Sequence, residues 1–204
     1  MTPLCITPDS VSKSIVAIVG GIGSGKSLVS RVLRLLGYDV YDCDSRAKAL
    51  MNTSPIIKRQ LIDTFGEDVF TSDGTVNRQV LAQIIFSNKT ALEWVNAIVH
   101  PQVIADILRT ADVVSQQPLF VETAIPHQSG IDVLAHSLWL VDAPIDVRIA
   151  RVIARDGASR SQVVARINSQ DFSQLCNPHI HRIVNDGSLA LIPQITKLLL
   201  SLPK

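Results

Sequence analysis

The sequence predicts an α/β fold in which a parallel sheet of buried strands is interrupted by a helical insertion. The first observation is a continuously apolar run, Ile15–Val19, followed by a glycine-rich turn and a helical pattern. This succession is typical of the start of a doubly wound sheet. The second observation is that strand-like runs become rare over residues 45–115 and return after them. A chain of 204 residues is long enough for one such domain with an insertion.

The remaining elements of the sheet domain follow from their patterns. A helix is expected to end at Gly37 and a short strand to follow it at Val40–Asp42. Later strands are predicted at 118–121, 138–141 and 182–184, and later helices at 145–155, 161–170 and 189–200. Within the insertion, the runs 61–65, 80–86 and 92–99 carry apolar residues three and four apart, as amphipathic helices do. The core therefore comprises residues 14–44 and 116–204, and the insertion residues 45–115.

Composition excludes several classes of protein. The 19 Lys and Arg nearly balance the 18 Asp and Glu, which argues against a nucleic-acid coat protein. The three cysteines, Cys5, Cys43 and Cys176, are scattered and form no CxxC pair, so neither a disulfide framework nor a zinc site is expected. Reduced thiols favour a cytoplasmic protein. No apolar run reaches membrane-spanning length, and residues 1–14 lack the apolar core of a signal peptide, so we interpret them as a short extension.

Residues 20–27, GGIGSGKS, match the phosphate-binding pattern G-x-x-x-x-G-K-[ST]. Glycines let the backbone curl around a phosphate, and the following helix directs its N-terminus at the anion. The alternative is a chance glycine-rich turn, but the pattern lies between a buried strand and a helix, as the motif requires. The predicted ATP-binding residues are Gly21, Ile22, Gly23, Ser24, Gly25, Lys26 and Ser27, with the Ser27 hydroxyl as a ligand of Mg²⁺.

Absent motifs narrow the class of nucleotide-binding protein. The Asn-Lys-x-Asp pattern of GTPases is missing, and Val121-Glu122 is only a weak equivalent of the acidic strand end of motor ATPases. The chain is also short, which favours a kinase that acts on a small molecule. Such an enzyme needs a group that orients the acceptor hydroxyl. Asp42 and Asp44 lie at the end of the second strand and suit that role, although helix capping at Asp44 or Ser45 explains a residue there equally well.

Arg148, Arg151 and Arg155 are spaced three and four residues apart, so a helix places all three on one face. Like charges on one face repel each other, and they become favourable if an anion is bound among them. The alternative is an ordinary solvated helix face. After a phosphate loop, an arginine clamp on the transferred phosphate is the better interpretation.

Taken together, these motifs resemble those of dephospho-CoA kinases over residues 15–200. The pieces that carry the resemblance, beside the phosphate loop, are Leu36-Gly37, Asp42-Cys43-Asp44, residues 73–78, Ile85-Phe86, His100-Pro101 as a helix-ending pair, residues 118–122, 151–156 and 166–170, and Asn185-Asp186-Gly187. Only the phosphate loop is specific alone, whereas the order and spacing of all the pieces are very specific. Arg148 is a departure, because the family often has glutamine there.

The resemblance implies a fold, a reaction and roles for residues. The fold is a P-loop five-stranded parallel sheet with flanking helices, a helical CoA-binding insertion, and a lid at about 145–170. The reaction uses ATP and Mg²⁺ to phosphorylate the ribose 3′-hydroxyl of dephospho-CoA, giving CoA and ADP in the last step of coenzyme A biosynthesis. The implied catalytic residues are Asp44, Lys26, Arg151 and Arg155, with Asn185 near the adenine of ATP and Arg78, His100, Pro101 and Glu122 on the acceptor side.

Two other functions remain open from the residues alone. One is a different P-loop kinase, such as a nucleoside monophosphate or sugar-acid kinase. The other is an inactive nucleotide-binding regulator, against which the presence of both Lys26 and Asp44 argues. We expect no nucleic-acid or membrane partner, and a monomer or small homo-oligomer.

Overall fold

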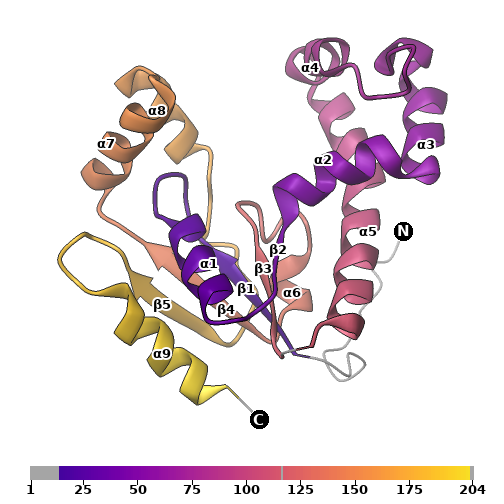
Figure 1. Cartoon of the computed structure of the whole chain (residues 1–204). Coiled ribbons are helices and arrows are strands. Elements are labelled where there is room, and N and C mark those ends of the chain that lie inside the picture. The colour runs from indigo at the N-terminus through magenta and orange to yellow at the C-terminus, as the bar shows by residue number, and fades with distance from the viewer. Residues whose placement is uncertain (1–13, 116, 203–204) are drawn as a thin grey trace. The chain divides into compact units, whose positions relative to one another are not determined.

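The computed structural model describes residues 14–115 and 117–202, which form two compact units. The first unit contains the described residues up to Tyr41 and from Ala111 onward, and the second contains Asp42–Thr110 (Figure 1). The expected N-terminal extension and Cys5 lie outside the described residues.

The first unit is built on a five-stranded sheet, as predicted. Its strands are β1 (Ile15–Val19), β2 (Val40–Asp42), β3 (Leu119–Glu122), β4 (Ser137–Asp142) and β5 (Ile180–Val184). They are arranged in the order β2-β3-β1-β4-β5, and β1 pairs in parallel with both β3 and β4, while β4 pairs in parallel with β5. Every residue of the central strand β1 is buried, which explains its continuous apolar sequence.

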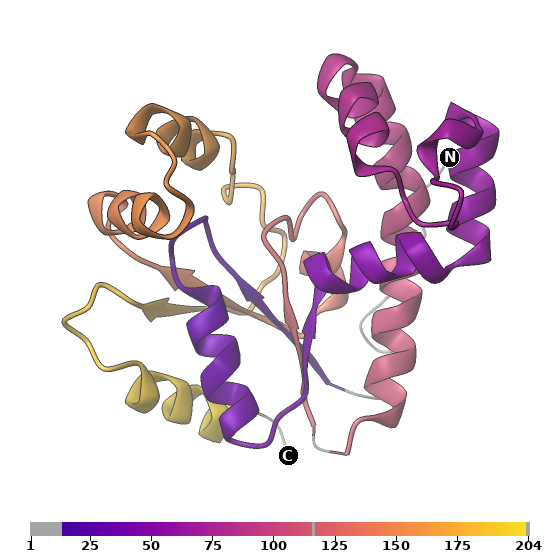
Figure 2. The same ribbon diagram turned by 45° about the horizontal axis from the view of Figure 1, so that its top comes forward.

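Two helices, α1 (Lys26–Leu35) and α9 (Leu191–Ser201), cover one face of this sheet (Figures 1 and 2). Val29 and Leu33 of α1 and Ile195 of α9 are fully buried against strand residues. The largest of these, Phe120 and Trp139, have ring centroids 5.0 Å apart. Each such buried side chain contributes roughly 1.5–3 kcal/mol, so this layer fixes the helix that follows the phosphate loop. A short helix, α6 (Ile131–Leu134), contacts β1.

The helices α7 (Ile145–Asp156) and α8 (Arg160–Asn168) form a hairpin in the segment expected to be a lid. Ile149 and Val152 of α7 pack against Val163 and Ile167 of α8, and the side chain of Ile22 joins the cluster. Ser159 and Gln162 form a capping box that starts α8. The hairpin is thus joined by apolar contacts to the phosphate loop.

The second unit is helical, with α2 (Cys43–Thr53), α3 (Pro55–Phe65), the 3₁₀ turn η2 (Glu67–Val69), α4 (Arg78–Ser87) and most of α5 (Lys89–Val113). Ser54 caps α3 by accepting a hydrogen bond from the amide of Ile57, and Pro55 takes the first helical position. In the turn before α4, hydrogen bonds from Thr71 and Thr75 lower the pKa of Asp73 to about 2.

The prediction that His100-Pro101 ends a helix is wrong, because α5 continues from Lys89 to Val113 with Pro101 inside it. A proline within a helix costs about 3 kcal/mol. Buried residues on both sides of it outweigh that cost: Ile98 and Val99 precede Pro101, and Val103 and Ile107 follow it. At roughly 1.5–3 kcal/mol for each, burial keeps the helix continuous. Among the described residues, no helix is long and apolar enough to cross a membrane.

Candidate active site

The phosphate loop connects β1 to α1 and depends on glycine at its two ends. Gly20 has φ 151° and Gly25 has φ 96°, which side-chain-bearing residues rarely adopt. A Cβ atom at Gly20 would overlap the carbonyl oxygen of Val141, and one at Gly25 would overlap the side-chain amide of Asn185. The loop therefore folds this tightly only with glycine at these two positions.

The same loop offers unused backbone donors to an anion. The amides of Gly23, Gly25 and Ser27 donate no hydrogen bond to any residue that the structure describes. Unpaired amides at the first turn of a helix, together with the helix dipole, favour bound phosphate. Lys26 Nζ donates to the carbonyl oxygen of Gly20 at 2.7 Å, so its charge lies at the loop.

Oxygen groups suited to Mg²⁺ occur at this site. Ser27 is exposed in the first turn of α1, where its hydroxyl is available. Glu122 ends β3 directly beside Ile18 of β1, so its half-buried carboxylate belongs to the strand next to the phosphate loop. Hydroxyl and carboxylate oxygens are the ligands that Mg²⁺ prefers, so the residues present fit the ion.

Two arginines of α7 contact the phosphate loop. Arg148 Nε donates to the carbonyl oxygen of Ile22 at 2.9 Å, and Arg151 Nη1 donates to those of Asn185 at 3.0 Å and Gly23 at 3.4 Å. Neither arginine forms an ion pair with a described carboxylate. Burial lowers the pKa of Arg148, which the charge of Asp142 partly opposes. Two guanidinium groups without a carboxylate partner make this side of the loop positive.

Arg155, which the sequence also assigned to the phosphates, is directed elsewhere. Its guanidinium donates to both carboxylate oxygens of Asp156, at 2.6 and 3.0 Å, and the side chain is exposed. The hydrogen bond to Asp156 raises the pKa of Arg155. Of the three arginines that helical spacing places on one face, Arg148 and Arg151 contact the phosphate loop, whereas Arg155 pairs with Asp156. A contact of Arg155 with phosphate stays a prediction.

Two residues that support the loop were not recognised as such from the sequence. Asn185 is 6% exposed, and its side-chain nitrogen donates to the carbonyl oxygen of Ser24 at 2.7 Å. Gln170 Oε1 accepts a hydrogen bond from the amide of Ile22 at 2.7 Å. In the sequence, both residues stand out only because residues 166–170 and Asn185 belong to motifs of the resemblance. The predicted contact of Asn185 with adenine stays a prediction.

We expect Asn185→Asp to weaken ATP binding. The change replaces a donor by a carboxylate oxygen facing the carbonyl oxygen of Ser24, and an unsatisfied buried group of this kind costs about 1–3 kcal/mol. The Kd for ATP should rise by about tenfold or more, as measured by isothermal titration. The control is Asn168→Asp on the exposed side of α8, which should leave the Kd unchanged. Equal ATP affinity in the Asn185 variant would contradict a supporting role.

In the second unit, Asp42 at the end of β2 and Asp44 at the start of α2 have different roles. Asp42 is the N-cap of α2: its Oδ1 accepts from the amides of Asp44 and Ser45, and its Oδ2 accepts from the Ser45 hydroxyl. Asp44 is exposed in the first turn, and its carboxylate takes no part in these bonds. The sequence suggested Asp44 or Ser45 as the cap of this helix, but in the structure the N-cap is Asp42.

Asp42→Ala should lower the free energy of unfolding by about 0.5–2 kcal/mol, because it removes the capping carboxylate of α2. Asp42→Asn, which retains an accepting oxygen, should restore most of that loss. Urea denaturation followed by circular dichroism measures both. Equal stability of the alanine variant and the parent chain would show that the cap is dispensable.

The predicted acceptor residues in the second unit differ in their surroundings. Arg78 and Lys48 line a mainly apolar cavity of about 210 Å³, together with Met51, Asn52, Val76, Leu81, Ala82 and Ile85. His100 is half-buried in α5, and Pro101 is exposed. Of the predicted site residues, Lys26, Ser27, Arg151 and Asn185 are gathered at the phosphate loop of the first unit. The residues Asp44, Arg78, His100 and Pro101 belong to the second.

Comparison with known proteins supports one family. The family model described as dephospho-CoA kinase matches residues 14–189. The chain is 39% identical over 186 residues to the dephospho-CoA kinase of Porphyromonas gingivalis, covering 90% of this chain and 92% of that one. It is 37% identical over 191 residues to that of Bacteroides fragilis, covering 90% of each.

Solved structures show the same fold. The protein TT1252 from Thermus thermophilus is 31% identical and superposes with a TM-score of 0.75, over 93% of this chain and 97% of its own. Dephospho-CoA kinase from Campylobacter jejuni, at 21% identity, has a TM-score of 0.66 over 92% of this chain and 96% of its own. With a family model that spans most of its length, the chain belongs to the dephospho-CoA kinase family.

Proposed function

We propose that this protein transfers the γ-phosphoryl group of ATP to the ribose 3′-hydroxyl of dephospho-CoA, which yields CoA and ADP. The observation that carries the proposal within the structure is the phosphate loop, whose free amides lie beside Lys26, Arg148 and Arg151. Membership of the dephospho-CoA kinase family supports dephospho-CoA as the acceptor. The reaction completes coenzyme A biosynthesis.

The residues at the loop stabilise the charge of the transferring group. Amides of the loop and Lys26 hold the β- and γ-phosphates, and Arg151 supplies hydrogen-bond donors where negative charge develops. The Ser27 hydroxyl, with Glu122 in support, would hold Mg²⁺, and the bound ion would neutralise phosphate charge. The apolar contact between Ile22 and the α7–α8 hairpin holds the hairpin at the phosphate loop, where the hairpin would limit the access of water to bound ATP.

Asp44 acts on the acceptor. Its exposed carboxylate accepts the proton of the 3′-hydroxyl as the oxygen bonds to the γ-phosphorus, and the bond from that phosphorus to the ADP oxygen breaks. Asp42 holds the first turn of α2, and so fixes the backbone from which Asp44 projects. Asp42 is therefore a positioning residue, whereas Asp44 is the proposed base.

The cavity of the second unit is the proposed site for part of the acceptor. Its walls are mainly apolar, and Lys48 and Arg78 add two positive charges. Dephospho-CoA combines a diphosphate with apolar and amide-containing segments, which fits such a lining. We further infer a cytoplasmic enzyme, a monomer or small homo-oligomer, that requires no nucleic acid.

A direct test mixes purified protein with ATP, Mg²⁺ and dephospho-CoA and follows ADP release, with CoA identified by mass. ADP should appear only with the acceptor, and in a one-to-one ratio with CoA. Control acceptors are CoA itself, whose 3′-position is already phosphorylated, a nucleoside monophosphate and a sugar acid. Equal turnover with a control acceptor would assign a different substrate, and ATP binding without any product would indicate an inactive regulator.

A further inference from the structure

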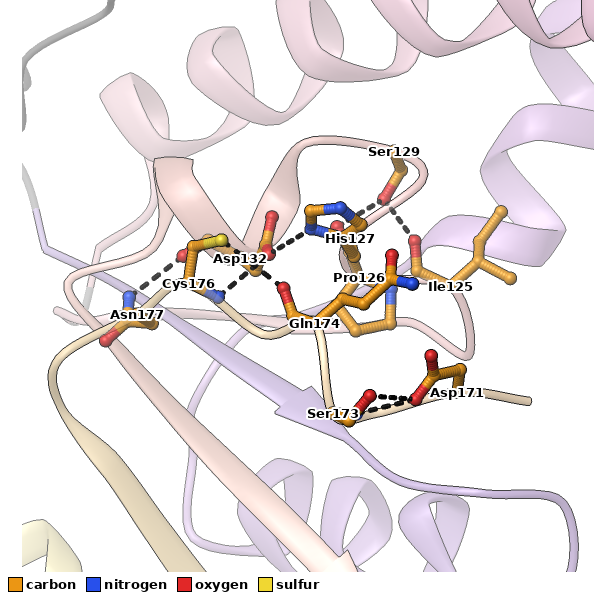
Figure 3. Close-up of polar contacts among 10 residues, drawn as sticks. All are labelled: Ile125, Pro126, His127, Ser129, Asp132, Asp171, Ser173, Gln174, Cys176 and Asn177. Carbon is orange, nitrogen blue, oxygen red and sulfur yellow. Dashed lines mark hydrogen bonds and ion pairs between the residues drawn. The ribbon is translucent and has the colours of Figure 1, made fainter.

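A second group of reactive side chains lies in the first unit, outside the phosphate loop. His127 comes from the loop after β3, Asp132 from α6, and Cys176 from the segment that leads from α8 to β5 (Figure 3). One potential ligand atom from each residue lies within 4.8 Å of the others. The fold thus brings together a nitrogen, an oxygen and a sulfur donor from segments distant in the sequence.

Asp132 is the buried member of this cluster. The residue has no exposed surface, and its Oδ2 lies 2.9 Å from His127 Nδ1 and accepts from the amide of Cys176 at 3.3 Å. Its other oxygen, Oδ1, is buried without any hydrogen-bond partner among the described residues. A buried carboxylate with an unused oxygen is unfavourable unless positive charge compensates it. A bound cation would supply that charge.

The segments that carry the ligands are held in place by other bonds. Asn177 Nδ2 donates to the carbonyl oxygens of Asp132, at 3.0 Å, and Ala135, at 2.6 Å. The Ser129 hydroxyl donates to the carbonyl oxygen of Ile125 at 2.7 Å and closes the loop that presents His127. These bonds hold the backbone beside Cys176 and the backbone beside His127, so the positions of the ligands are set by the fold.

The spacing and the donors suit a zinc-type ion. Bonds of about 2.0–2.3 Å to tetrahedral zinc place ligand atoms about 3.5 Å apart. The side chains of His127 and Cys176 are exposed and can close the remaining distance around the fixed Asp132. Thiolate and imidazole ligands select zinc over Mg²⁺. A cavity of about 300 Å³ lined by Asp132, Cys176, His136 and His179 gives an ion access and leaves room for water as a fourth ligand.

We propose that His127, Asp132 and Cys176 bind one divalent metal ion of the zinc type, separate from the Mg²⁺ of the phosphate loop. The ion joins the segment that returns from the α7–α8 hairpin to the loop after β3 and to α6, and so stabilises the first unit. This site could not be predicted from the sequence, because the ligands form no CxxC pair and lie 5 to 49 residues apart along the chain.

Cobalt provides the test, because a bound thiolate gives a sulfur-to-cobalt absorption band in the near ultraviolet. The full chain is stripped with a chelator and titrated with Co²⁺ without ATP, and Zn²⁺ affinity is then measured by competition with a chromogenic chelator. We expect one Co²⁺ per chain and a sulfur band that Zn²⁺ abolishes. In Cys176→Ser the band should vanish and the Kd for Zn²⁺ should rise at least about 100-fold.

The controls separate this site from others. Cys43→Ser should retain the band, because Cys43 belongs to the second unit. His127→Gln should weaken Zn²⁺ binding without changing the far-ultraviolet circular dichroism of the metal-free chain, which excludes misfolding. A chain that binds no Co²⁺, or a band that survives Cys176→Ser, would overturn the proposal and leave His127 and Asp132 as a simple hydrogen-bonded pair.

Discussion

Replacing Arg151 by alanine should lower kcat by about 10³–10⁵-fold, the range typical of an arginine that stabilises a transferring phosphoryl group. Arg151 contacts the carbonyl oxygens of Gly23 and Asn185 and has no carboxylate partner among the described residues. Its hydrogen bonds go to neutral acceptors, so its charge is available to phosphate. The effect should appear mainly in kcat, because the charge is needed most in the transition state.

Two further variants, one at Arg151 itself and one at Arg160, make this expectation specific. Arg151→Lys keeps the charge but loses the planar fork of donors, so its kcat should fall between those of the alanine variant and the parent chain. Arg160→Ala is the matched control, because Arg160 is exposed and pairs with Asp146 at 3.0 Å. Thermal denaturation is measured in parallel, since loss of the Arg151 hydrogen bonds costs about 1–3 kcal/mol. A kcat within tenfold of the parent value in Arg151→Ala would exclude a catalytic role.

Arg155→Ala tests the other arginine assigned from helical spacing. A small change in kcat would mean that Arg155 serves only to pair with Asp156. A loss as large as that of Arg151→Ala would show that Arg155 leaves Asp156 during turnover and contacts phosphate. The sequence could not distinguish these cases. Helical spacing places side chains on one face, but the neighbouring Asp156 decides where a flexible arginine donates its hydrogen bonds.

The parts of the fold that were predictable have strong local causes. The strand Ile15–Val19 is apolar throughout because both of its faces are covered, and the phosphate loop needs glycine where its backbone is too close for a Cβ atom. Other features depend on distant partners. The continuity of α5 through Pro101 rests on buried residues on both sides, and the cluster of His127 and Cys176 exists only in the folded chain.

For the acidic pair Asp42 and Asp44, too, the sequence predicted the location, and the folded structure decided which residue caps the helix. From the sequence, these residues left two interpretations open: a carboxylate that orients the acceptor hydroxyl, or helix capping by Asp44 or Ser45. The structure gives the cap to Asp42, because its side chain reaches the amides of Asp44 and Ser45. This geometry leaves Asp44 as the carboxylate to test.

Asp44→Asn should lower kcat by about 10²–10⁴-fold, because the amide cannot accept the proton of the attacking hydroxyl. Asn and Asp have nearly the same shape, and Asp44 is exposed, so the free energy of unfolding should stay within about 0.5 kcal/mol of the parent value. The Kd for ATP should also be unchanged, because the phosphate loop does not contain Asp44. Steady-state kinetics with dephospho-CoA, urea denaturation and ATP titration measure the three quantities.

Asp42→Asn is the matched control for this experiment. It makes the same chemical change two residues away, and its remaining oxygen still accepts the capping hydrogen bonds of α2. Its kcat should therefore fall far less than that of Asp44→Asn. If the two variants lost activity equally, the acidic pair would act through the position of α2 and not through a base. If Asp44→Asn kept near-normal turnover, the proton would leave by another route, and Asp44 would have no catalytic role.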